Sequence, residues 1–315
     1  MQLPRFIVAY ATALLSAPWR FSLVYLSLFS NTSHDFLTRG LQKKYSFKTI
    51  LSTLLNNHIL SSGYLIIDET EVDKSFAEKI PCLGWLWSHR QNKYIFGLQL
   101  VVVCWTNGKV TIPVAWKIYQ KDSGKTKITL AQELIRYCLF TLRIKPKAWL
   151  FDSFYASEAL LKYLINHDQL FFSQLPKNRK FNQLSLSEMN KGRPYWQETG
   201  VIKGGIRVQV VKNRRKYYVT NSIGLERTEQ LKTYKIRWQI EEVFRFVKHE
   251  LGFEKCQSTS LVGQNTHFGT CFYLYATLQD IAEKTQMTDY AVKLKATLDD
   301  NFVKQLTLPT FIGTA

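Results

Sequence analysis

The sequence predicts an α/β protein, with a mixed sheet flanked by helices, a β-rich insertion and an N-terminal helical region. Two short apolar runs, Leu65–Asp68 and Ala148–Asp152, each end in an aspartate and are typical of buried strands. A β-rich hairpin and a segment of helical periodicity lie between these two runs. With 315 residues, the chain is long enough for one large domain or two smaller ones.

The composition predicts a globular protein that binds a polyanion. Hydrophobic residues make up 46% of the chain and charged residues 21%, which excludes a disordered chain. The 42 Lys and Arg residues exceed the 24 Asp and Glu residues, so the net charge is +18. Nucleic acid is the usual partner of such an excess. An anionic membrane surface is the alternative, but the basic residues are scattered rather than gathered along one amphipathic segment.

The cysteines and the N-terminus both favour the cytoplasm. The five cysteines are far apart and never form a C-x-x-C pair, so neither a disulfide framework nor a zinc site is indicated. The apolar start, Met1–Phe29, resembles a signal peptide, but Pro18 and Arg20 interrupt it and no A-x-A cleavage site follows. We therefore expect neither export nor a membrane anchor.

The N-terminal half predicts helices, then a strand, then a hairpin. Residues 1–62 read as a helical region that either packs on the main domain or binds DNA, because apolar residues recur at helical spacing in Phe36–Leu41 and Phe47–Leu60. Ser33-His34-Asp35 is a candidate cap for the helix that begins near Phe36. After the strand at Leu65–Asp68, two β-rich runs flank an Asn-Gly turn, which is a strong hairpin signal: Tyr94–Val103 and Val110–Ile118.

The remaining elements complete a core of alternating helices and strands. They are a helix over Thr129–Leu142, the strand Ala148–Asp152, a helix over Ser157–His167, a strand over Leu170–Leu175, and a long helix over Glu229–Leu251 that Gly252 ends. We expect an N-terminal helical region at 1–62, a core α/β domain made of 63–176 and 231–258, a β-rich insertion at 177–230, and C-terminal helices at 259–315.

Three acidic residues are candidates for one cluster. If the strands that end in Asp68 and Asp152 are parallel neighbours, both carboxylates emerge at one edge of the sheet, and a late helix that carries Glu241 can pack there. Converging carboxylates repel one another unless cations compensate them. Mg²⁺ or Mn²⁺ suits such oxygen ligands, and two ions can activate the attacking group and stabilise the leaving oxygen. In isolation, Asp68 is more readily interpreted as a turn residue at the end of a strand, and Asp152 is compatible with a cap of the helix that starts after Phe154.

The late helix carries a phenol, a guanidinium, a carboxylate and an ammonium on one face. Tyr234, Arg237, Glu241 and Lys248 stand at offsets of 0, 3, 7 and 14, and at about 100° per residue these fall within roughly 60° of one another. Glu242 is the alternative carboxylate, but it is rotated by about 100° from Glu241. A solvated charged face is the simpler interpretation of this helix.

The chain resembles the DDE transposases of bacterial insertion sequences, in the group that carries a Tyr-x2-Arg-x3-Glu-x6-Lys helix. The late helix matches this pattern at every spacing. Ile66–Thr70 resembles the first-acid segment of the family, although the family often has a second Asp where Glu69 stands, and Leu150–Ser153 resembles the second-acid segment. The region before Asp68 is short beside family members that have larger N-terminal DNA-binding regions.

The resemblance implies a ribonuclease H-like catalytic domain that cuts DNA at transposon ends and joins them to a target. It assigns catalysis and metal binding to Asp68, Asp152 and Glu241. It implies a homodimer on double-stranded DNA in the cytoplasm, associated with the nucleoid. Residues expected to contact DNA are Tyr234, Arg237, Lys248, Trp196, Lys212, Arg214, Arg215 and Lys216.

Several alternatives stay open. A ribonuclease H-like nuclease or resolvase would cut without joining, and a non-catalytic relic of a transposase would bind DNA without cutting. Trp196 is as compatible with a core position as with stacking on a flipped base. The basic cluster Lys212–Lys216 is also compatible with a solvated hairpin tip.

Overall fold

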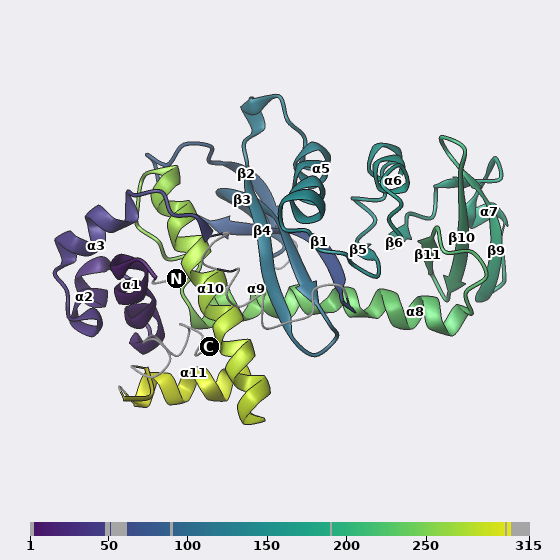
Figure 1. Ribbon diagram of the computed structural model, residues 1–315. Coiled ribbons are helices and arrows are strands. Elements are labelled where there is room, and N and C mark those ends of the chain that lie inside the picture. Colours follow the sequence, from purple (N-terminus) through teal and green to yellow (C-terminus); the bar gives the residue numbers. More distant parts are fainter. Residues whose placement is uncertain are drawn as a thin grey trace.

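A mixed sheet with helices on both faces forms the centre of the molecule (Figure 1), in a computed structural model that describes residues 3–47, 51, 62–88, 91–189, 191–299 and 301–303. The strands are β1 (Tyr64–Asp73), β2 (Gly84–Ser88), β3 (Lys93–Thr106), β4 (Thr111–Tyr119), β5 (Trp149–Phe151), β6 (Phe171–Leu175), β7 (Lys180–Phe181), β8 (Leu184–Ser185), β9 (Tyr195–Ile202), β10 (Ile206–Asn213) and β11 (Lys216–Thr220). The helices are α1 (Arg5–Ser16), α2 (Leu23–Ser30), α3 (His34–Leu41), α5 (Lys127–Arg136), α6 (Glu158–Ile165), α7 (Leu186–Met189), α8 (Arg227–Lys235), α9 (Gln239–Glu250), α10 (Leu261–Thr285) and α11 (Asp289–Leu298). Short helical turns are η2 (Lys121–Ser123), η3 (Tyr137–Thr141) and η4 (Ile236–Trp238).

The strand order places the two predicted aspartate strands side by side. The order is β2-β3-β1-β5-β6-β11-β10-β9-β7-β8, and β4 pairs with β3. β3 is antiparallel to β1 and β4, whereas β5 is parallel to both β1 and β6. The β-rich segment continues the same sheet, because β11 pairs antiparallel with β6. The predicted mixed sheet, its parallel centre and its hairpin are confirmed.

The centre of the sheet is apolar because helices cover both faces. Ile66 and Ile67 in β1 and the whole of β5, Trp149–Phe151, are fully buried. On one face, α5 packs on β3 and β4 and contacts α6; on the other, α9 packs on β1 and β4 and is contacted by α10. Figure 1 shows α8 and α9 running end to end beneath the sheet, from the β9–β11 region to the N-terminal helices.

The N-terminal helices pack as a bundle on α10 and α11. α1 contacts both of these helices, and Ser33 caps α3 by accepting a hydrogen bond from Phe36 N, as predicted. Tyr10 in α1 donates a hydrogen bond of 2.8 Å to Nδ1 of His267 in α10. Most of the predicted helix Phe47–Leu60, like the tail after 303, lies outside the described residues.

Three sequence expectations need correction, and one strand of the core sheet was missed. β1 continues to Asp73, so Asp68 lies in the middle of its strand and not at its end. The strand β2 was not predicted. The helix expected over Thr129–Leu142 ends as an α-helix at Arg136 and continues as a π-turn. The long helix expected over Glu229–Leu251 is divided into α8 and α9 by the 3-10 turn η4, while Gly252 ends α9 with a φ of +61°.

Candidate active site

Asp68 and Asp152 lie at a step in the sheet. The register pairs Ile67 of β1 with Phe151 of β5, so the two aspartates are the next residues on adjacent parallel strands. β5 ends at Phe151, whereas β1 continues to Asp73. The step therefore opens one side of β1 from Asp68 onward, and Asp152 enters the loop that leads to α6. This is the carboxyl edge of the parallel strands, where open α/β sheets place their sites.

Arg237 joins Asp68 to Glu241. Its Nη1 lies 2.7 Å from Oδ2 of Asp68, and its Nη2 lies 2.6 Å from Oε1 of Glu241. The side chains of Arg237 and Asp68 are 15% and 16% exposed, and that of Glu241 is 32% exposed. One guanidinium thus bridges a carboxylate on the sheet and another on the helix that crosses it.

The division of the late helix gives Arg237 its position. η4 carries Arg237 between α8 and α9, so the backbone turns more tightly there than in an α-helix. Beside it, the ring of Tyr234 is buried and packs edge-on against Tyr218, with centroids 5.1 Å apart. The Arg237 guanidinium carbon lies 5.9 Å from the Tyr234 ring centroid. The predicted Tyr, Arg and Glu thus form one contiguous group.

Burial and nearby negative charges raise the pKa values of both aspartates. Burial raises the pKa of Asp68 to about 7, against the opposing effect of Arg237 and with an added rise from Asp152. Burial also raises the pKa of Asp152, and the nearby carboxylate of Glu69 raises it further. The carboxylates of Asp68, Asp152 and Glu69 therefore interact with one another, and a cation near them stabilises their charged forms.

Asp152 is held by its own loop. Its Oδ1 accepts hydrogen bonds from the backbone N–H groups of Phe154 and Tyr155, at 2.9 and 3.4 Å. Its backbone carbonyl accepts a hydrogen bond of 2.9 Å from the Ser173 hydroxyl in β6. The cap of α6 is Ser157, so Asp152 is not the helix cap that its position also allowed.

Glu69 anchors this loop from the other face of the sheet. Successive residues of a strand point to opposite faces, and Glu69 faces α5 while Asp68 faces α9. The Tyr155 hydroxyl donates to Oε2 of Glu69 at 2.8 Å, and Nζ of Lys127 in α5 lies 2.6 Å from Oε1. Tyr155 and Lys127 were not predicted from the sequence, although the Asp-x-x-Tyr spacing fits a loop that folds back on its own aspartate.

Lys248 lies on the predicted helix face but is engaged by protein groups. Its Nζ donates to the backbone carbonyl of Glu71 at 2.6 Å and lies 3.3 Å from Oε1 of Glu254. Its side chain is only 8% exposed. The Glu71 carbonyl belongs to the part of β1 beyond the end of β5, so Lys248 binds the strand edge that the step exposes.

The predicted residues of the β-rich segment lie apart from this cluster. Trp196 is on β9, four strands from β5, where its ring packs edge-on against Phe181 at 5.7 Å. Nζ of Lys212 lies 5.6 Å from the Tyr217 ring centroid. The tip between β10 and β11 lies toward the carboxyl edge of the sheet, because Tyr217 pairs with Leu175 at the carboxyl end of β6. The exposed residues of this tip are Arg214, Arg215 and Lys216.

The acidic cluster is suited to a hard divalent cation, but here the guanidinium of Arg237 bridges two of its carboxylates. Among the described residues, no three His, Cys, Asp or Glu side chains are assembled as a metal site. Asp68, Asp152 and Glu241 nevertheless supply the oxygen donors that Mg²⁺ and Mn²⁺ prefer. The positive charge of Arg237 lies between Asp68 and Glu241, where a metal ion would also relieve the repulsion. The donor set therefore fits a divalent metal once Arg237 moves.

No helix in the described part of the chain has the length and apolar character needed to cross a membrane. A family model described as "Transposase DDE domain" matches residues 62–276, which is more than half of the chain. The search of curated protein sequences found no match to this chain. Among solved structures, the fold is similar to the piggyBac transposase in a cryo-EM "synaptic complex with hairpin DNA", with a TM-score of 0.58 and 11% sequence identity, over 98% of this chain and 71% of that chain. This similarity confirms the predicted ribonuclease H-like fold, and the family match shows that the chain belongs to the DDE transposase domain family.

Proposed function

We propose that this protein is a Mg²⁺-dependent DNA transposase of a bacterial insertion sequence. It would hydrolyse phosphodiesters at the transposon ends and transfer the freed strands to a target without a covalent enzyme intermediate. Two copies on double-stranded DNA would hold the two ends, in the cytoplasm at the nucleoid. The observation that carries the proposal is the link from Asp68 through Arg237 to Glu241, beside Asp152 on the adjacent strand.

Each member of this group has a distinct task. Asp68, Asp152 and Glu241 would hold Mg²⁺ or Mn²⁺, and two bound ions supply charge stabilisation and an activated oxygen nucleophile. Arg237 would exchange its carboxylate partners for a substrate phosphate, to which a guanidinium makes bidentate contacts. Tyr234 orients Arg237, and Lys248 keeps the open edge of β1 in place near the DNA.

The direct test is metal-dependent nicking of a supercoiled plasmid that carries the flanking DNA of the coding region. Alanine at Asp68, Asp152 or Glu241 should abolish nicking in Mg²⁺ while leaving DNA binding in chelator largely intact. Glu242→Ala is the matched control, since Glu242 is on the same helix but bonds to Trp238 and Arg245. Full nicking activity in all three acidic variants would refute the assignment.

Strand joining separates the proposed transposase from its alternatives. Covalent insertion of a free 3′-hydroxyl end into a target plasmid supports a transposase. Nicking without joining supports a nuclease or resolvase, and DNA retention without nicking in either Mg²⁺ or Mn²⁺ supports a relic. Sedimentation of the protein with paired end fragments tests the dimer.

A further inference from the structure

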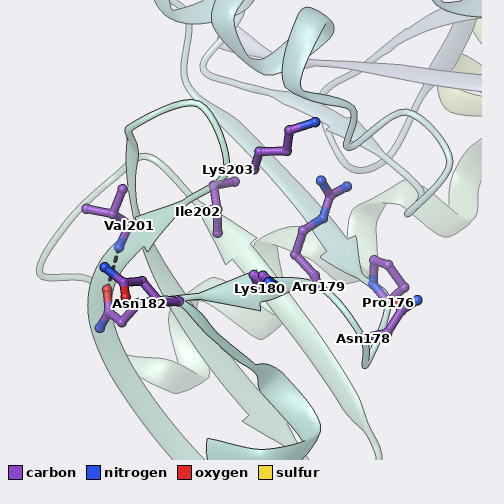
Figure 2. Close-up of a pocket in the computed structure, with 9 residues that line it drawn as sticks. Pro176, Asn178, Arg179, Lys180, Asn182, Val201, Ile202 and Lys203 are labelled. Atoms are coloured by element: carbon purple, nitrogen blue, oxygen red, sulfur yellow. Dashed lines mark hydrogen bonds between the residues drawn. The ribbon is translucent and has the colours of Figure 1, made fainter.

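A basic pocket of about 800 Å³ lies between the segment that follows β6 and the turn between β9 and β10 (Figure 2). None of the nine described residues that line it is acidic, and three are cations: Arg179, Lys180 and Lys203. Figure 2 shows the side chains of Arg179 and Lys203 extending toward the same side of the pocket. Positive charge is therefore concentrated in one concave site.

Few carboxylates compete for this charge. Lys203 has a side chain that is 78% exposed and lies 3.7 Å from the carboxylate of Glu158. Glu158 is also bound by Lys162 at the shorter distance of 2.8 Å. Lys180 is exposed as well. An exposed ion pair at 3.7 Å contributes little, so Lys203 can exchange Glu158 for an external anion at small cost.

The walls of the pocket are fixed before any ligand arrives. β7 and β8 are joined by a two-residue turn in which Asn182 and Gln183 both have positive φ, as in a type I′ hairpin. The Asn182 side chain accepts a hydrogen bond from Val201 N at 2.9 Å and donates one to Glu198 at 3.2 Å. These bonds tie the turn to β9, so ligand binding does not require the pocket to be ordered first.

One hydrogen bond connects the pocket to the candidate active site. Nη2 of Arg179 donates to the backbone carbonyl of Ala156 at 2.7 Å. Ala156 belongs to the loop that begins at Asp152 and is anchored through Tyr155 to Glu69. The pocket therefore lies directly beyond the Asp152 loop, on the α6 side.

We propose that this pocket binds backbone phosphates of the same DNA whose scissile bond lies at Asp68, Asp152 and Glu241. Lys and Arg side chains and amide groups are the usual protein partners of DNA phosphates, and such contacts fix position without reading sequence. The proposal rests on the proposed function for the identity of the ligand. The expectation that the ligand carries phosphates, bound by Lys180 and Lys203 beside Arg179, follows from the residues of the pocket alone.

The test compares two double variants of equal charge. Lys180→Gln/Lys203→Gln removes the two exposed cations and leaves Arg179 in place, because Arg179 also holds the Asp152 loop. Lys109→Gln/Lys145→Gln is the control: both lysines are exposed, Lys109 lies in the β3–β4 turn near the first residue of β1, and Lys145 precedes β5. Both control sites lie at the amino ends of the strands, away from the carboxyl edge. Equal thermal midpoints would show that each variant folds.

Binding to a short random-sequence DNA duplex is measured in chelator at several salt concentrations. Two lost phosphate contacts should weaken binding about tenfold near physiological salt and reduce the slope of log K against log salt by nearly two, at about 0.9 per phosphate. The slope of the control variant should stay closer to the wild-type slope than that of Lys180→Gln/Lys203→Gln does. Equal slopes and affinities in the two double variants would overturn the proposal, as would wild-type protein that does not bind the duplex. The Lys203→Gln single variant should give about half of the change in slope.

The outcome is independent of catalysis. If the wild-type protein binds DNA through the pocket but never nicks it in Mg²⁺, the proposed enzymatic function fails and the phosphate site stands. If the protein nicks DNA normally while the two double variants bind alike, the phosphate site fails and the enzyme assignment stands.

Discussion

Arg237 is an internal counter-ion for the acidic cluster. Its guanidinium contacts one carboxylate of the sheet and one of α9, both partly buried. Removing one partner of such a group leaves like charges without compensation, which destabilises the fold. The same arrangement means that a divalent metal and Arg237 compete for Asp68 and Glu241.

We therefore predict that Arg237→Gln gains more stability from Mn²⁺ than the wild-type protein does. Without the guanidinium, the ion meets uncompensated carboxylates, and binding that is confined to the folded state raises the unfolding midpoint. A difference of about 1 kcal/mol corresponds to roughly 2–4 °C. The measurement is thermal unfolding with and without Mn²⁺.

Arg245→Gln is the matched control for this experiment. Arg245 is on the same helix and pairs with Glu242 at 2.8 Å, but that pair is half exposed and lies off the acidic face. Its Mn²⁺ shift should equal that of the wild-type protein. A shift in Arg237→Gln no larger than in Arg245→Gln would contradict the counter-ion role.

The hydroxyl of Tyr155 contributes to stability through Glu69. Tyr155→Phe removes a 2.8 Å hydrogen bond to a carboxylate while preserving the buried ring. Glu69 keeps Lys127 as a partner, so the expected loss is about 1–2 kcal/mol in the free energy of unfolding. Urea denaturation measures it, and Tyr163→Phe serves as control because Tyr163 is on α6, away from Glu69. Equal stability of the two variants would show that the Tyr155 bond contributes nothing.

At the scale of elements, the β3–β4 turn fixes the start of α9. The side chain of Gln239, the first residue of α9, donates to the Gly108 carbonyl at 2.7 Å and accepts from Thr111 at 2.6 Å. The helix that carries Glu241 is thus docked on the predicted hairpin. Inside the turn, Oδ1 of Asn107 accepts hydrogen bonds from two backbone N–H groups.

Gly108→Ala should destabilise the protein by about 1 kcal/mol. Gly108 has a φ of +97°, in the left-handed region that an L-residue adopts only at a cost. An added Cβ meets open space there, so the cost is conformational and not steric. Gly84→Ala is the control, because its Cβ also meets open space and its φ is not in that region. Chemical denaturation of both variants should show a loss only for Gly108→Ala.

The sequence predicted the elements whose signal is local. The hairpin follows from Asn107-Gly108, and the buried strand β5 from an apolar run that is too short for a helix. The second half of β1 was missed because it is rich in Asp and Glu, which are rare in strands. Its pairing with β3 as far as Asp73 supplies the stability that its composition lacks. The break at η4 was missed because periodicity does not record a local tightening of a helix.

At the scale of the molecule, the sequence indicated the acidic residues and the arginine that gather at the candidate site, but not how they are bonded. The match to a family helix selected Arg237 and Glu241, yet the pairing of Arg237 with Asp68 joins residues 169 positions apart. The Glu69–Tyr155 bond likewise spans 86 positions. Such contacts depend on which face of β1 each helix covers, and a single sequence does not show which face that is.

The N-terminal helices are joined to the region that matches the DDE domain through a neutral histidine. His267 in α10 accepts a hydrogen bond from Tyr10 of α1 at Nδ1 and donates from Nε2 to the Gly252 carbonyl at the end of α9, at 3.1 Å. Burial lowers the pKa of His267 to about 3, from an ordinary value near 6.5, and the charge of Lys74 adds to this effect. Protonation therefore occurs in the unfolded chain well before it occurs in the folded one.

The contribution of His267 to stability should consequently fall as the pH decreases from about 6.5 toward 3, whereas the raised pKa of Asp68 acts in the opposite direction. Between these values the unfolded state binds one proton more than the folded state at His267, so the free energy of unfolding rises with pH there and levels off above 6.5. The slope due to this residue approaches about 1.4 kcal/mol per pH unit. Urea denaturation at pH 5 and pH 7 measures the dependence. His267→Gln keeps an amide donor and acceptor but does not titrate, so its free energy of unfolding at pH 7 minus that at pH 5 should be less positive than in the wild-type protein. An equal difference in the wild-type protein and the variant would mean that the junction of α1, α9 and α10 is not the acid-sensitive part of the molecule.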